Sequence, residues 1–62
     1  MRDYRIGDVV EVRGKWHPKY NTIGTVESVS DRLVLVWFHH QDRSIVWAYT
    51  PNYVMKHFQR YF

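Results

Sequence analysis

Short runs of β-branched residues, separated by turn-forming residues, constrain the fold of this chain more than any other feature. In the first run Val10 and Val12 fall on one face, as expected of a strand with a core-facing side. Four short strands joined by turns, with one long loop after the first, indicate a small half-open barrel. The runs cover residues 6–12, 23–30, 33–38 and 44–49.

The second run is expected to bury Val26 and Val29, and Gly24 within it indicates a bulge or a close backbone approach. The third run is apolar at every position, which indicates that both of its faces are covered or that the outer one has another use. Alternation along this run predicts inward side chains at Val34, Val36 and Phe38, and outward ones at Leu33, Leu35 and Trp37.

A short helix is predicted after the fourth run. Thr50 is a favourable N-cap residue, and Pro51 suits the first helical position. Val54 and Phe58, followed by Tyr61 or Phe62, recur at helical spacing. We expect a short helix, or a single tight turn with a tail, that closes the barrel.

Composition narrows the class of protein. The 62-residue chain has no cysteine to supplement a small core, so we expect its three Trp, five Tyr and three Phe to give an aromatic-rich core. Its four histidines lack the spacing of a structural zinc site, and no metal or cofactor is predicted. No run approaches the length of a membrane span and no leader-like segment opens the sequence, so we expect one soluble, cytoplasmic domain over residues 1–62.

The order of these motifs resembles a known fold. The Gly7-Asp8 turn with its valines, then Gly24 and Val26, then Val34, Val36 and Phe38 resemble the GD-x-V-x-V, G-x-V and V-x-V-x-F skeleton of small prokaryotic and phage SH3-like barrels. KOW and Tudor-type modules and the E subunit of photosystem I are similar over about residues 5–58. The resemblance implies a mostly β fold: a small half-open SH3-like barrel of four to five antiparallel strands with a short C-terminal helix or 3-10 turn. Its motifs are core and turn residues, so it says little about function.

Excess apolar surface is the strongest functional signal in the sequence. A monomer rarely leaves a contiguous apolar patch in water, so such a patch indicates a protein partner or a second copy of the chain. The alternative is that Phe58, Tyr61 and Phe62 fold back over the patch as a second core layer. The patch is expected to contain Leu33, Leu35 and Trp37, joined by Ile45 and Trp47 of the next strand.

Residues 13–20 form a predicted long loop in which basic and aromatic side chains interleave. Trp16 and Tyr20 suit a protein interface, where such rings are common anchors. Together with the basic residues they equally suit nucleic acid, because Lys and Arg meet phosphate while rings stack on bases. A third reading is that both rings pack over the barrel end and pin the loop.

Two more specific activities are weighed against the same residues. Residues 48–54 resemble the segment that lines the polyproline groove of signalling SH3 domains, but the long loop here is basic and would repel the usual basic ligand. Residues 44–49 lack the glutamine of the matching strand in the plasmid-borne type II dihydrofolate reductase. With no triad, paired carboxylates or phosphate-binding loop, no catalytic activity is predicted.

The leading hypothesis is a non-catalytic protein-interaction module, a phage or prokaryotic accessory protein that docks on a larger complex. Its predicted contact residues are Trp16, Tyr20, Leu33, Leu35, Trp37 and Trp47. The alternative is a KOW-like or chromatin-barrel-like module, which its net charge of +3 would draw to nucleic acid. The predicted phosphate contacts are Arg13, Lys15, Lys19, Arg32 and Arg43.

Overall fold

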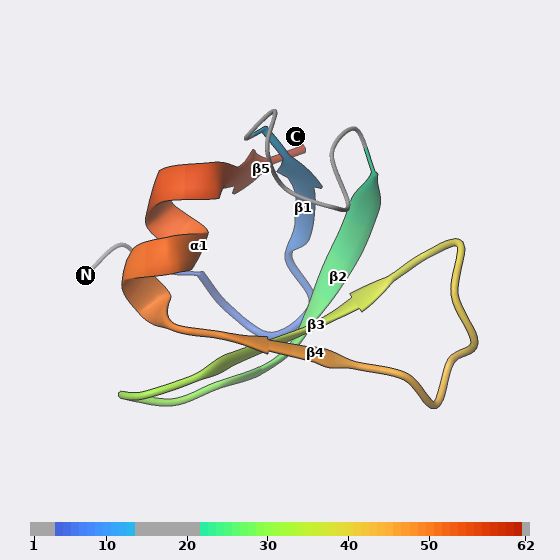
Figure 1. The fold of residues 1–62 in the computed structure, drawn as a ribbon, viewed down its shortest axis with the longest axis horizontal. Helices are drawn as coiled ribbons and strands as arrows, with labels where there is room; N and C mark the ends of the chain where they lie inside the picture. The colour runs from blue at the N-terminus through green and yellow to red at the C-terminus, as the bar shows by residue number, and fades with distance from the viewer. Residues whose placement is uncertain (1–3, 14–21, 62) are drawn as a thin grey trace.

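The computed structural model describes residues 4–13 and 22–61, which form one antiparallel sheet and one short helix (Figure 1). The strand order is β4-β3-β2-β1-β5, and β4 and β5 are the two edges, so the described sheet is a half-open barrel. The predicted mostly β fold, with up to five antiparallel strands and a short C-terminal helix, is therefore confirmed. The elements are β1 (Val9–Val12), β2 (Ile23–Val29), β3 (Val34–Phe38), β4 (Trp47–Tyr49), α1 (Pro51–His57) and β5 (Phe58–Arg60).

The first four strands form a meander, and β2 is the central strand of the five-stranded sheet. Gly24 of β2 lies opposite Val10 on one side and Phe38 on the other. A Cβ atom at Gly24 would stand 2.8 Å from Cγ1 of Val36 and 2.9 Å from the carbonyl oxygen of Trp37. The predicted close backbone approach is thus confirmed, whereas the irregularity in the strand lies further along, between Val26 and Ser28.

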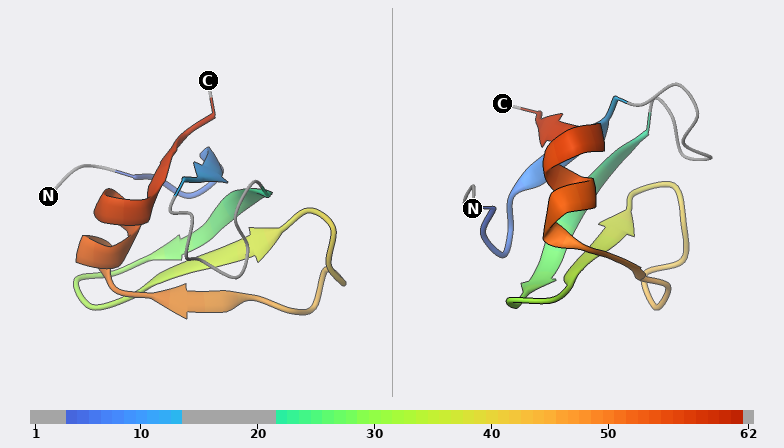
Figure 2. Two further views of the ribbon diagram at one scale, coloured as in Figure 1. Left: turned by 45° about the horizontal axis from the view of Figure 1, so that its top comes forward. Right: turned by 60° about the vertical axis from the view of Figure 1, so that its left-hand side comes forward.

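The helix begins where the sequence predicts. The Thr50 side chain accepts a hydrogen bond from the backbone N–H of Tyr53 at 3.2 Å, and Pro51 occupies the first turn, where its missing N–H costs nothing. The helix ends sooner than the spacing predicts, because Phe58 is extended and starts β5. Figure 2 shows α1 leading from β4 to β5, which pairs with the outer side of β1.

The core is built mainly of valine. Each buried strand contributes alternate side chains, and the helix adds Val54. The expected aromatic richness is only partly found, because two Phe and one Tyr are buried while Trp37 and Trp47 are not. Val29 is half-buried and packs against the core rather than within it. The buried residues are Tyr4, Val10, Val12, Val26, Val34, Val36, Phe38, Val54 and Phe58.

The fourth strand is shorter than predicted. It begins at Trp47 rather than at Ser44, because Asp42 holds the preceding residues in a turn. The Asp42 carboxylate accepts from the backbone N–H of Ser44 at 3.2 Å, and its carbonyl oxygen accepts from that of Ile45 at 3.0 Å. These bonds compete with strand pairing at the start of the predicted run.

Candidate interaction surface

The outer face of β3 carries the predicted apolar side chains. Val34, Val36 and Phe38 are fully buried, which confirms the predicted alternation. Leu35 and Trp37 are half-buried on the opposite face, and Leu33, just before the strand, is 45% exposed.

Trp37 is covered by the loop that follows its own strand. The Arg43 guanidinium lies 4.5 Å from the centre of the Trp37 ring, a cation–π arrangement. The indole Nε1 donates to the carbonyl oxygen of Gln41 at 3.1 Å, and the His39 ring stands 4.9 Å away. The loop therefore shields part of a ring that the sequence predicts to be an open contact.

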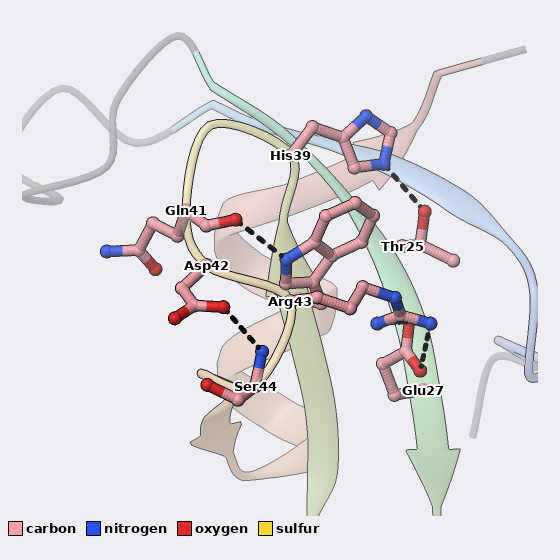
Figure 3. A network of polar contacts seen from close by, with 8 residues as sticks. Thr25, Glu27, His39, Gln41, Asp42, Arg43 and Ser44 are labelled. Carbon is pink, nitrogen blue, oxygen red and sulfur yellow. Dashed lines mark hydrogen bonds and ion pairs between the residues drawn. The ribbon is translucent and has the colours of Figure 1, made fainter.

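Polar contacts with β2 hold this loop in place (Figure 3). Arg43 donates to both carboxylate oxygens of Glu27, at 3.0 and 3.3 Å. On the same strand, Oγ1 of Thr25 and Nε2 of His39 form a hydrogen bond of 2.7 Å. A two-pronged ion pair and a second bond from one strand fix the loop geometry better than a single surface contact would.

Trp47 lies on the other face of the sheet from Leu35. It pairs with Val36, and residues directly opposite one another on neighbouring strands share a face. The prediction that Trp47 joins Leu35 and Trp37 on one face is therefore wrong in its arrangement. Tyr49 lies two positions further along β4, on the same face as Trp47, and it packs against the core, which agrees with this arrangement.

Gln41 nevertheless links the two indoles. Its side-chain Oε1 accepts from Nε1 of Trp47 at 2.7 Å, while its backbone carbonyl accepts from Trp37. Trp47 stays 39% exposed at the rim of the sheet. The two rings are thus held near one loop from opposite faces of the sheet.

Among the described residues, the most exposed apolar run lies just before and within β4. Ile45 and Val46 are 44% and 43% exposed, and Trp47 and Ala48 follow them, also exposed. We call residues 45–48 the apolar edge. Sequence reasoning included Ile45 in the patch but missed Val46. The missed signal is the absence of any charged residue from Ser44 to Met55.

Phe58 and Tyr61 do not cover the outer face of β3. Phe58 is buried with Phe38, their ring centres 6.3 Å apart, and it receives the Tyr4 hydroxyl on its carbonyl oxygen at 3.2 Å. Tyr61 is 49% exposed and its backbone N–H bonds to Val9 at the β1 side of the sheet. The predicted covering layer is therefore not formed by the described residues, and Phe62 lies outside them.

The predicted phosphate contacts do not gather into one basic surface in the part of the chain that the structure describes. Arg13 follows β1 at one end of the sheet, and Arg32 lies in the turn between β2 and β3 at the other end. Both are exposed, whereas Arg43 is engaged by Glu27 and Trp37. The predicted loop contacts Lys15, Trp16, Lys19 and Tyr20 lie outside the described residues.

Aromatic rings from the segment that resembles a polyproline groove pack on one another. The rings of Tyr49 and Tyr53 are stacked with centres 5.2 Å apart, and the Phe58 ring lies 5.2 Å from Tyr49. Burial, and then the neighbouring Tyr53, raise the pKa of Tyr49 to about 12. This cluster extends the core between α1 and β4.

The described residues contain neither a cluster of metal-ligating side chains nor a helix that could span a membrane. Within residues 4–13 and 22–61, no three His, Cys, Asp or Glu side chains gather to hold a metal ion. No helix among those residues has the length and apolar character needed to cross a membrane. Comparison of the chain with protein-family models, with curated proteins and with solved structures finds no match.

Proposed function

We propose that this chain is a non-catalytic protein-interaction module, a small SH3-like barrel that docks on a larger protein assembly. The observation that carries the proposal is the apolar edge, where Ile45, Val46 and Trp47 are consecutive, large and exposed. Scattered single apolar residues on a surface need no explanation, but a contiguous run on one sheet edge does.

The structure around the apolar edge favours a binding role for its exposed side chains. The loop before it is held by Asp42, Gln41 and the Arg43–Glu27 pair, so its apolar side chains are presented in a fixed arrangement. A preorganised surface loses less conformational entropy on binding. Trp47 is the residue type that most often anchors protein interfaces, and its indole N–H already has a partner within the chain.

Nucleic acid binding is the second candidate, and the net charge of +3 favours it. Among the described residues, however, Arg13 and Arg32 stand at opposite ends of the sheet, and Arg43 would have to leave Glu27 to meet a phosphate. The apolar edge itself carries no charge for a phosphate backbone. We therefore rank protein docking first.

Photo-crosslinking in the source cells tests this ranking. A photoreactive phenylalanine derivative at position 46 should give adducts that protease digests and nuclease does not. The matched control is the same derivative at Ile6, an exposed aliphatic residue in the turn before β1. We expect the adduct from position 46 only.

The contrary results are equally clear. Nuclease-sensitive adducts, together with tryptophan quenching by DNA or RNA that weakens steeply between 50 and 200 mM salt, would favour the nucleic-acid function. Equal adducts from positions 6 and 46, or none from either, would contradict docking through the apolar edge.

A further inference from the structure

The two edges of the sheet differ in how they are protected from pairing with another strand. At β5, Arg60 contacts the Asp8 carboxylate at 3.4 Å and lies over the Tyr4 ring, 5.0 Å from its centre. Charged side chains on an edge strand discourage edge-to-edge pairing. In the described part of the chain, β4 borders one strand only, β3, and has no charged residue.

The absence of charge continues on both sides of β4. No Asp, Glu, Lys, Arg or His occurs from Ser44 to Met55. When two identical strands pair antiparallel, each residue of such a stretch faces another residue of the same stretch. Such pairing places no like charges opposite one another and requires no charged side chain to be dehydrated.

We propose that the partner at the apolar edge is a second copy of this chain, which pairs its β4 antiparallel with the first and joins the two sheets. This inference rests on the proposed interaction through the apolar edge, and it puts a second copy of the chain there in place of a larger assembly. An unrelated extended peptide could pair with the same edge, but a self-complementary uncharged strand fits its own copy without any further requirement. Pro51 limits the pairing to the residues before it, because proline has no N–H to donate.

Symmetry makes the geometry of such a pair testable. The axis that relates two antiparallel strands of one continuous sheet stands perpendicular to the sheet, so one residue of the edge faces its own copy. A residue one position away is displaced from its own copy by two residues along the strand. Its Cα–Cα distance is then roughly 8 Å, which is too long for a disulfide.

Because the chain has no cysteine, each introduced thiol is unique. Single cysteines at positions 45 to 49, which cover β4 and the two residues before it, should give a disulfide-linked dimer at one position and little at its neighbours. Gln59→Cys on β5 is the control and should stay monomeric. Equal crosslinking at all positions, or none at positions 45 to 49, would overturn the symmetric pairing.

Sedimentation equilibrium tests the same pairing in a chain without introduced cysteines. A short edge interface belongs to the weak class, so we expect dissociation between roughly 1 µM and 1 mM. The mass should rise from 7.6 kDa towards twice that value for the wild type and for Gln59→Lys. Val46→Lys places two cations near the axis and should stay at 7.6 kDa with an unchanged circular dichroism spectrum.

The failures of the two proposals are distinguishable. A chain that stays monomeric at about 1 mM, yet gives protein adducts with another partner from position 46, would overturn self-pairing and leave the docking function. A monomer without such adducts would overturn both.

Discussion

Replacing Gly24 by alanine would place a methyl group where the backbone of β2 lies close to β3. The new carbon would meet Val36 at 2.8 Å, the Trp37 carbonyl oxygen at 2.9 Å and the Phe38 ring at 3.2 Å. The second of these atoms belongs to the backbone of β3, and β1 pairs with the other side of Gly24. The strand therefore cannot retreat from the contact.

The expected cost follows from two opposing effects. Overpacking a core of this kind destabilises by about 1–3 kcal/mol. Alanine offsets about 0.4–1 kcal/mol of this destabilisation, because it lowers the conformational entropy of the unfolded chain. The free energy of unfolding should thus fall by about 1–2 kcal/mol, which lowers Tm by roughly 5–15 °C in a domain this small.

Thermal and urea unfolding, followed by tryptophan fluorescence, measure this loss. Gly7→Asn is the control, because Gly7 has a φ of +96°, no atom within 4 Å of a built Cβ, and Asn tolerates positive φ better than other residues. It should cost less than Gly24→Ala. A Gly24→Ala variant as stable as the wild type would refute the close packing of β2 against β3.

Two further predictions concern side chains around the candidate surface. A double-mutant cycle of Arg43→Ala and Glu27→Ala should give a coupling energy of only about 0.3–1 kcal/mol, because the pair is exposed. Tryptophan emission should shift in Arg43→Ala, because the guanidinium no longer lies over the Trp37 ring. A coupling energy near zero with unchanged emission would contradict the contact. Ultraviolet absorbance at high pH should show a tyrosine titration near 12 that Tyr49→Phe removes. Since burial favours the neutral phenol, Tyr49 contributes its full stabilisation to the fold below pH 10, and this stabilisation is lost as the pH rises towards 12. A titration of Tyr49 near pH 10 would argue against its packing on Tyr53.

The sequence predicts best where one local rule acts alone. Strict alternation identifies the buried side of β3, since Val34, Val36 and Phe38 have no competing use. The cap at Thr50 and the proline after it likewise locate the start of α1. Both signals lie within a few residues of the structure that they specify.

Prediction fails where a distant partner decides the outcome. Phe58 continues the helical spacing from Val54, but pairing with Val12 of β1 draws it into a strand. The face on which Trp47 lies depends on its register against Val36, which no local pattern in β4 reveals. The candidate site has a different limit: Gln41 lies in the loop between β3 and β4 and accepts from both indoles, and alternation along a strand does not predict the contacts of a loop residue.

The pairing of β5 with β1 also has a consequence for how the chain folds. Tyr4 and Phe58 are 54 positions apart along the chain, yet the Tyr4 hydroxyl donates to the Phe58 carbonyl. Contacts between such distant positions require a large loop to close before they give any stabilisation, which slows folding. A nascent chain that has not yet reached Phe58 leaves one side of β1 without a partner and its valines open to water. The sheet should therefore form in one step, and only after β5 has emerged.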